Sequence, residues 1–304
     1  MEIKPSALAG WTLFTVLLFL SCFYLAAGSL MKSLTGVWPY ITLIIGEAAA
    51  FGVPILFLTR YRPLHGLANV RNKKIRKHYV PFILYSSAAI TLATFCLNYL
   101  SSLFSSSGRD AGMQSLYPVS SGGTTVEILM AVAAVAVVPA LLEEILIRGV
   151  LFSFYEKRGA MTAILVTAMS FAMLHIYPEA LLAAFVAGLG YAYMLHVTGS
   201  VWAGVIAHLI NNLYSIFISW LAANFTFSPY WNYFVAANIV LCLVFLYVAL
   251  GCLSDLMHGD VVPKVTMGRN GFHRSFTGAV NSSGFILFFS VFLFRTALIV
   301  FLGI

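Results

Sequence analysis

The chain has 304 residues, of which 61% are hydrophobic and only 9% are charged. An average soluble domain has about 25% charged residues, so this composition excludes an ordinary soluble protein and indicates a polytopic membrane protein. The formal net charge of +7 does not indicate nucleic-acid binding. Basic residues in short loops beside apolar spans mark the cytoplasmic side of a membrane protein, and we expect no nucleic-acid partner.

Apolar runs that could cross a bilayer follow one another along the chain. A transmembrane helix needs about 20 apolar residues, and a helix satisfies its own backbone hydrogen bonds in lipid. The sequence therefore predicts an all-α transmembrane helical bundle of about eight or nine helices. We place them near residues 7–31, 37–59, 80–105, 124–155, 160–177, 179–198, 200–223, 230–254 and 283–304. We expect a single membrane domain over residues 1–304, with 124–223 as its catalytic core.

A basic cluster between the second and third predicted helices sets the expected orientation. Its members are Arg60, Arg62, Arg71, Lys73, Lys74, Arg76 and Lys77. By the positive-inside rule this loop is cytoplasmic, and it can rest on anionic membrane lipid. We therefore expect a multi-pass protein of the cell membrane with a cytoplasmic N-terminus, an external loop at 106–123 and a cytoplasmic loop at 255–282.

Six polar residues lie inside the apolar runs of the predicted core. An ionisable side chain in hydrocarbon is costly and by default indicates a functional site. Carboxylates and imidazoles are also the groups that transfer protons in catalysis. The six residues are Glu143, Glu144, Arg148, His175, His208 and Asn212.

The spacing of the first three divides them into a pair and a single carboxylate. Glu144 and Arg148 stand at i and i+4 with the acid first, which is the favourable order for a helical ion pair. Glu143 points about 100° away on the same helix, and its own i+4 neighbour is Ile147. We expect a structural ion pair of Glu144 with Arg148. Glu143 then has no cationic partner, which suits a catalytic base in a poorly solvated site.

The lengths of the helices predict which residues share a depth. Glu143 and His175 lie at nearly equal separations from Arg158, the tip of the hairpin formed by helices 124–155 and 160–177. Both should lie roughly 22–26 Å from that tip. The same calculation places His208 about 15 Å from their level if helix 179–198 is straight and untilted. Tilt, or an irregular turn after Pro178, must close this gap if one site is to form.

Pro139 lies one turn before Glu143. Proline has no backbone N–H, so it leaves the carbonyl group of Val135 without its helical partner. A kinked or opened helix at this position would admit water or peptide. A plain kink is an equally good interpretation.

Three segments resemble the signature of the CAAX prenyl endopeptidase and bacteriocin-processing (CPBP, or Abi) family of intramembrane proteases. The family pattern is EExxxR, then FxxxH, then HxxxN or HxxxD. Here it reads Glu143-Glu144-Ile-Leu-Ile-Arg148, Phe171-Ala-Met-Leu-His175 and His208-Leu-Ile-Asn-Asn212. The resemblance covers residues 140–215, and Ile147 departs from it because members often have an aromatic residue there.

The resemblance implies a peptide hydrolase of the glutamate type. Glu143 and His175 would activate a water molecule, and His208 and Asn212 would hold the oxyanion that develops at the peptide carbonyl. The implied substrate is a peptide or lipidated protein, either a prenylated CAAX tail or another membrane-proximal peptide. No cofactor is required in this scheme.

A zinc-dependent membrane protease is one alternative, with Glu143, His175 and His208 as ligands. Glutamate with two histidines is a legitimate catalytic zinc set. However, the sequence has no HExxH motif, and the three ligands would come from separate helices.

A second alternative is a non-catalytic membrane immunity or partner-binding protein that keeps the motifs for structure. The completeness of the three motifs argues against it. A transporter that relays protons through Glu and His is a third alternative, although transporter folds often have repeated halves and none is visible here.

Overall fold

The computed structural model describes residues 4–60, 70–104, 124–175, 178–225, 230–259 and 261–302, and all regular structure within them is helical. The basic residue Arg62 and the predicted external loop at 106–123 lie outside the described residues.

The first half of the described chain contains two interrupted helices and two continuous ones. In order, these elements are α1 (Pro5–Ser33), α2 (Trp38–Glu47), η1 (Ala48–Gly52), α3 (Val53–Arg60), η3 (Lys77–Tyr79), α4 (Val80–Phe104), α6 (Thr125–Val132), η4 (Ala133–Val137), α7 (Val138–Glu144), η5 (Ile145–Leu151) and α8 (Phe152–Glu156).

The second half begins with α9 (Ala160–Leu174) and the short turn η6 (Pro178–Ala180). It continues with α10 (Leu181–Thr198), α11 (Val201–Phe225), α12 (Trp231–His258), α13 (Phe272–Val280) and α14 (Ser283–Leu302).

The membrane-spanning character predicted from the sequence is confirmed. Eight helical segments of the described ranges are long and apolar enough to cross a membrane. The remaining predicted span, 160–177, is the shorter helix α9 of 15 residues. This helix ends at Leu174 because His175 takes an extended backbone conformation, with φ −73° and ψ 130°. The chain is thus an all-α polytopic bundle.

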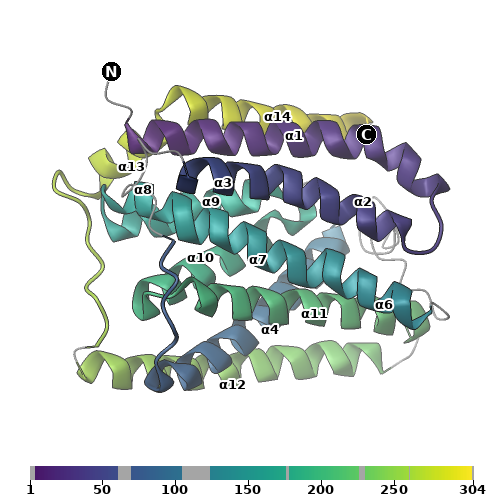
Figure 1. Ribbon diagram of the computed structural model, residues 1–304. Helices are drawn as coiled ribbons and strands as arrows, with labels where there is room; N and C mark the ends of the chain where they lie inside the picture. The colour runs from purple at the N-terminus through teal and green to yellow at the C-terminus, as the bar shows by residue number, and fades with distance from the viewer. Residues whose placement is uncertain are drawn as a thin grey trace.

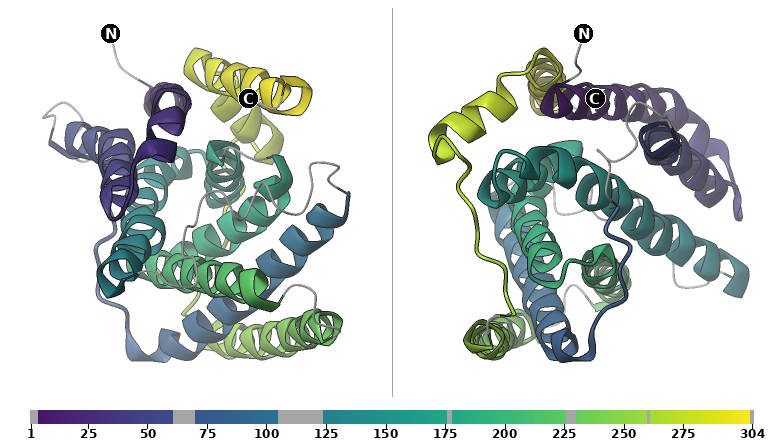
Figure 2. Two further views of the ribbon diagram at one scale, coloured as in Figure 1. Left: turned by 90° about the vertical axis from the view of Figure 1, so that its right-hand side faces the viewer. Right: turned by 60° about the vertical axis from the view of Figure 1, so that its left-hand side comes forward.

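The helices form a central group with a flanking layer on each side (Figure 1). Helix α1 packs along α14 on one side, and α4 packs along α12 on the other. Between them, α9 packs along α10, and α11 contacts α10, α4 and α7. Figure 2 shows the same layers from two further directions. The segments that carry the three motifs, on η5 with α7, on α9 and on α11, therefore lie between the two flanking layers.

Three π-helical turns interrupt the two long helices that carry carboxylates. Turn η1 follows Glu47 directly, turn η5 follows Glu144 directly, and turn η4 precedes Pro139. A π-turn inserts one residue into the helical repeat, and such turns occur often at functional sites. These turns therefore change the direction of side chains close to the predicted site.

Sequence signals explain where several of these helices begin and end. At the start of α6, the Thr124 side chain accepts a hydrogen bond from the Glu127 backbone and the Glu127 carboxylate accepts one from the Thr124 backbone. This reciprocal capping box satisfies two free donors. Helix α10 ends at Gly199, whose φ of +65° suits a residue without a side chain.

The loop predicted at 255–282 contains a helix that the sequence analysis missed. Helix α13 has only nine residues, too few to cross a membrane. Its apolar residues Phe276 and Ala279 pack into the bundle core, while His273 and Arg274 are exposed. An amphipathic helix of this length suits a membrane surface. Hydropathy over a long window averages its two faces and therefore does not detect it.

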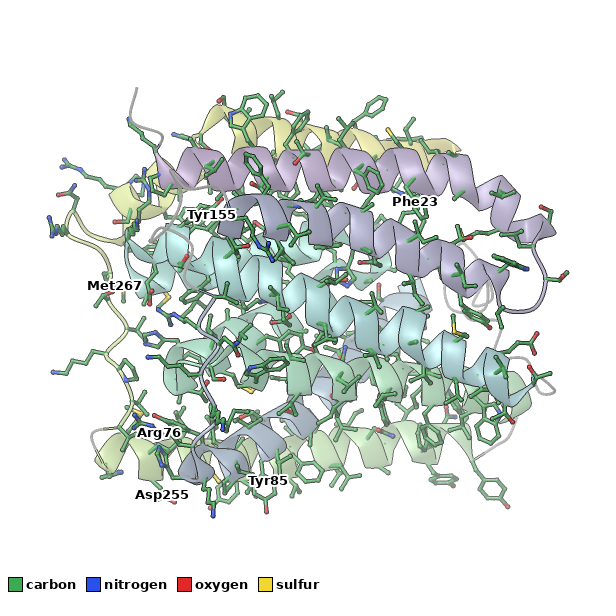
Figure 3. All side chains as sticks on the ribbon, in the orientation of Figure 1. Phe23, Arg76, Tyr85, Tyr155, Asp255 and Met267 are labelled. Atoms are coloured by element: carbon green, nitrogen blue, oxygen red, sulfur yellow. The ribbon has the colours of Figure 1, made fainter. Side chains whose placement is uncertain are left out.

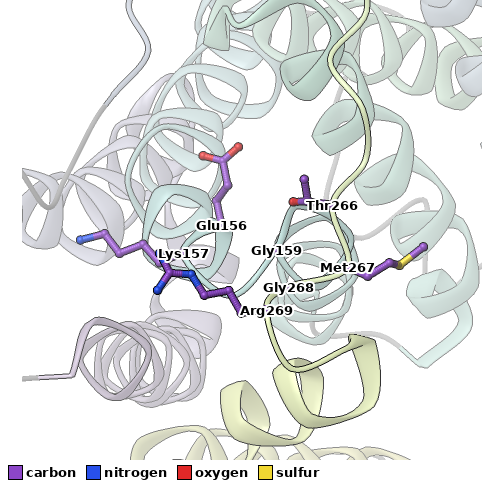
Figure 4. A pocket seen from close by; sticks show the side chains of 7 residues that line it. All are labelled: Glu156, Lys157, Gly159, Thr266, Met267, Gly268 and Arg269. Atoms are coloured by element: carbon purple, nitrogen blue, oxygen red, sulfur yellow. The ribbon is translucent and has the colours of Figure 1, made fainter.

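A strap, residues 261–271, crosses one end of the bundle before α13. Thr266 accepts hydrogen bonds from the backbone of Ala160 and Met161, and so satisfies free donors at the start of α9. Gly159 and Gly268 meet here so closely that a Cβ on Gly159 would lie 2.5 Å from the Gly268 nitrogen. A shallow pocket opens between the two segments (Figure 4); its lining residues are Glu156, Lys157, Gly159, Thr266, Met267, Gly268 and Arg269.

The charged segments gather at this same end of the bundle. Figure 3 labels Arg76, Asp255 and Met267 at this end. Arg71 forms an ion pair with Glu156 and its carbonyl oxygen accepts from the Val201 backbone. The basic segment 70–77 and the strap thus lie at the same end of the bundle. This agrees with the positive-inside rule, by which the basic loops of a membrane protein lie on one side of the membrane.

Candidate active site

The Glu144–Arg148 ion pair lies at the centre of the candidate site. Arg148 Nη1 is 2.7 Å from Glu144 Oε1, and both side chains are completely buried. Arg148 Nη2 donates to the Gly188 carbonyl oxygen at 3.2 Å. The guanidinium also lies 4.3 Å from the centre of the Phe171 ring, a cation–π distance. Arg148 therefore ties its own helix to α9 and α10.

His208 contacts Glu144 directly. Its Nδ1 lies 3.2 Å from Glu144 Oε1, and its ring stacks on Tyr191 with ring centres 5.3 Å apart. Because a carboxylate oxygen only accepts, Nδ1 is the donor in this contact. The carboxylate and the stacked ring together fix the orientation of the imidazole and leave Nε2 for another partner.

The predicted separation of about 15 Å between His208 and the other site residues is wrong. The Phe171 ring contacts both imidazoles, with ring centres 4.8 Å from His175 and 5.4 Å from His208. The residues of α9 and α11 therefore reach one site.

Two features close the gap that straight, parallel helices would leave. Helix α7 and its continuation run obliquely across α11 (Figure 1), and Tyr191 and Phe171 bridge the remaining distance with large side chains. Gly188 also permits a close crossing of α10 over α9, because a Cβ there would lie 3.0 Å from Ala168 Cα. The sequence calculation assumed upright helices and so overestimated the separation.

His175 is oriented by the end of its own helix. Its backbone nitrogen bonds to Ala172 in a tight last turn, which leaves the Phe171 carbonyl oxygen free. The His175 Nδ1 atom lies 2.9 Å from that oxygen. A carbonyl oxygen only accepts, so Nδ1 donates and Nε2 carries the lone pair. Nε2 is thus the nitrogen that can accept from a water molecule.

Asn212 closes the break that Pro139 makes in the long helix. Its Nδ2 atom donates to the Val135 carbonyl oxygen at 3.2 Å, the group that proline leaves without a helical partner. Asn212 lies one turn after His208 on α11. An amide nitrogen carries two hydrogens, so one N–H of Asn212 remains for another acceptor.

Glu143 differs from its neighbour in having no cationic partner. Within the described ranges its carboxylate forms no hydrogen bond or ion pair, and it interacts electrostatically with Glu47, Glu144 and Arg148. Glu47 is a further intramembrane carboxylate that the sequence analysis did not single out. The signal that marked Glu143, an ionisable residue in an apolar run, applies to Glu47 as well.

Gly204 makes room for the Glu144 carboxylate. A Cβ at this position of α11 would lie only 2.6 Å from Glu144 Oε2. That oxygen is buried and has no hydrogen-bond partner among the described residues. The closeness of α11 to Glu144, and hence the contact with His208, depends on the missing side chain.

A comparison with protein-family models found one family that part of this chain resembles. Residues 125–214 match the family model "Type II CAAX prenyl endopeptidase Rce1-like". The matched segment includes all three motifs and confirms the resemblance to the CPBP family drawn from them. The matched family is one of endopeptidases, which supports a protease. No curated protein and no solved structure matches the chain.

Proposed function

We propose that this protein is an intramembrane endopeptidase that hydrolyses a peptide bond with an activated water molecule. One observation carries the proposal: three motifs from separate helices converge, with His175 and His208 on the same Phe171 ring and Glu144 on His208. A half-buried carboxylate without a cationic partner among the described residues, Glu143, lies next to Glu144 in the chain and interacts electrostatically with Glu144 and Arg148.

Glu143 and His175 are the proposed activators of water. The Glu143 carboxylate accepts a proton from water while the water oxygen bonds to the peptide carbonyl carbon. His175 Nε2 accepts the second water hydrogen as a hydrogen bond and so orients the molecule. When the carbon–nitrogen bond breaks, Glu143 returns its proton to the leaving amine nitrogen, and the carboxylate is regenerated.

His208 and Asn212 are the proposed donors to the oxyanion. In the proposed reaction the His208 imidazole carries a proton on each ring nitrogen. One N–H group bonds to Glu144 and the other bonds to the oxyanion. Asn212 has a second amide hydrogen beyond the one bonded to Val135. Removing one donor of this type typically costs a factor of about 10²–10³ in turnover.

Glu144 and Arg148 have a structural role in this proposal. Their carboxylate and guanidinium are paired and fully buried, so neither is available to a substrate. Glu144 acts on the reaction through His208, whose ring it orients.

The proposed substrate is a prenylated CAAX-type tail or another membrane-proximal peptide. The family match supports a peptide or prenylated-protein substrate in a membrane, and the basic segment 70–77 can contact anionic lipid. We also propose that the charged end of the bundle faces the cytoplasm of a cell, which makes the N-terminus cytoplasmic.

The proposed reaction needs no metal ion. Among the described residues, no three side chains of His, Cys, Asp and Glu are grouped so that they could hold one metal. This supports the glutamate mechanism over the zinc mechanism.

The deciding experiment measures cleavage of a quenched prenylated CAAX peptide by the purified protein. It compares the unchanged protein with Glu143→Ala, each with and without a strong chelator. We expect cleavage that is lost in Glu143→Ala and indifferent to the chelator.

Each other outcome has a definite meaning. Loss of cleavage with the chelator would replace the glutamate mechanism with the zinc mechanism. Full activity of Glu143→Ala would exclude Glu143 as the base. If a set of prenylated and unmodified peptides is not cleaved at all, the partner-binding alternative replaces the proposal.

A further inference from the structure

Glu47 lies on the inward face of the second spanning helix. Ala50 and Phe51, one turn later, are 2% and 1% exposed, and residues at i, i+3 and i+4 share a helix face. On the opposite side, Ile45 and Val53 are exposed to the surroundings of the bundle. A membrane protein that places a carboxylate on its inward face assigns it a partner or a task.

A close contact at Gly46 fixes the rotation of this helix about its axis. Gly46, which directly precedes Glu47, packs against the Phe23 ring of α1 so closely that a Cβ would lie 2.5 Å from a ring carbon. Helix α2 and turn η1 also pack against α7, the helix that carries Glu143. Because Gly46 faces α1, Glu47 is turned about 100° from that contact, toward the centre of the bundle.

Among the residues that the structure describes, no cation forms an ion pair with Glu47 to balance a negative charge. Its Oε2 atom is buried and forms no hydrogen bond within the described part of the chain. The cation that interacts with Glu143 is Arg148, which is already bonded to Glu144 and Gly188. Glu143, on the facing helix, is also without a hydrogen bond, and the two carboxylates interact electrostatically.

Two neighbouring carboxylates in a poorly solvated site cannot both be ionised, because mutual repulsion and burial oppose the second charge. We propose that Glu47 is a positioning residue for Glu143, and that the two carboxyl groups share one proton. This inference rests on the proposed role of Glu143 as the base. The other ionisable groups that interact with Glu143 are Glu144, Arg148 and Tyr191.

A shared proton would serve the reaction in two ways. It holds the Glu143 carboxylate in one orientation through a hydrogen bond from Glu47, and it reduces the charge buried in the site before substrate enters. The water proton then passes to the ionised member of the pair, and the leaving nitrogen takes a proton from the pair, which ends with one proton as it began.

The test is infrared spectroscopy of the purified protein in lipid, which needs no substrate and is therefore independent of the proposed activity. Glutamate is labelled with ¹³C, and the carbonyl stretch of a protonated glutamic acid is followed in H₂O and D₂O. The variants are Glu47→Gln and Glu143→Gln, which keep the side-chain shape. Glu127→Gln is the control, because Glu127 lies in the exposed capping box of α6.

We expect a protonated-glutamate band that shifts in D₂O, that changes or disappears in both Glu47→Gln and Glu143→Gln, and that is unaltered in Glu127→Gln. A band that is unaltered in Glu47→Gln or in Glu143→Gln would show that the proton does not lie between them and would overturn the proposal. Absence of the band in the unchanged protein would overturn it too, even if a variant fails to fold.

A kinetic measurement tests the positioning role separately. Glu47→Gln should lower kcat about tenfold with little change in KM, because substrate contacts are kept while the base is less well oriented. Glu127→Gln should change neither constant. An unchanged kcat in Glu47→Gln would exclude a positioning role for Glu47.

Discussion

At the scale of single residues, the two adjacent glutamates have different surroundings although both lie inside the membrane. Glu144 has a guanidinium at 2.7 Å and an imidazole nitrogen at 3.2 Å. Glu143, one position earlier, has neither. Helical geometry causes this difference, because successive side chains point about 100° apart. We therefore expect substitutions at the two positions to have separate effects.

Glu144→Ala should destabilise the protein, because it leaves the buried Arg148 charge without its partner. Breaking a buried ion pair typically costs 3–5 kcal/mol, so we expect a loss of about 3 kcal/mol in the free energy of unfolding. A thermal-unfolding measurement in detergent checks this. Glu143→Ala is the comparison and should unfold close to the unchanged protein. Equal stability of Glu144→Ala and the unchanged protein would contradict the structural role of the pair.

At the scale of helices, small residues decide how closely the motif-bearing elements approach. Gly188 lets α10 cross α9 beside Ala168, and Gly204 lets α11 approach the Glu144 carboxylate. Interfaces between transmembrane helices are rich in small residues for this reason. The turns η4 and η5 then adjust the long helix, and Asn212 supplies the hydrogen bond that Pro139 removes.

Gly204→Ala tests the close approach of α11. The added methyl group would lie within 2.6 Å of Glu144 Oε2, so the carboxylate or the helix must move. We expect a loss of about 1–3 kcal/mol in unfolding free energy and slower peptide cleavage, because His208 moves with α11.

The matched control is Gly251→Ala in α12. Nothing lies within 4 Å of a Cβ at Gly251, and alanine is the better helix former by about 1 kcal/mol. This variant should be as stable as the unchanged protein or more stable. If both alanine variants behave alike in the unfolding and cleavage assays, the contact at Gly204 has no special importance.

At the scale of the whole molecule, charged segments gather at one end of the bundle and buried apolar residues form its interior. The basic segment 70–77, the end of α8 and the strap meet at one end (Figure 3), while a buried core cluster extends from Ala9 in α1 to Phe288 in α14. The polar site lies within the central helices. This arrangement places the proposed catalytic side chains between the helices and concentrates positive charge at one end.

The orientation of the bundle can be tested by cysteine labelling. In a variant without Cys22, Cys96, Cys242 and Cys252, single cysteines replace the exposed Lys264 of the strap or the exposed Thr35 between α1 and α2. We expect a membrane-impermeant maleimide to label Thr35→Cys in intact cells and Lys264→Cys only in inverted vesicles. The reverse pattern would show that the charged end is external.

The sequence alone determined the spanning helices, the Glu144–Arg148 pairing and the carbonyl left free by Pro139. These depend on properties of one segment: apolar length, the i to i+4 spacing and the missing N–H of proline. The short helix α13 was missed, because its nine residues alternate between two environments instead of forming one apolar run.

Tertiary structure decided which segments meet. The contact of His208 with Glu144, the bond from Asn212 to the Val135 carbonyl and the approach of Glu47 to Glu143 each join different helices. Their relative depth depends on tilt, on close crossings at glycine and on the extended backbone of His175, which ends α9. A calculation from residue numbers contains none of these. Packing between helices fixes them, because crossing angles follow from the shapes of the facing side chains.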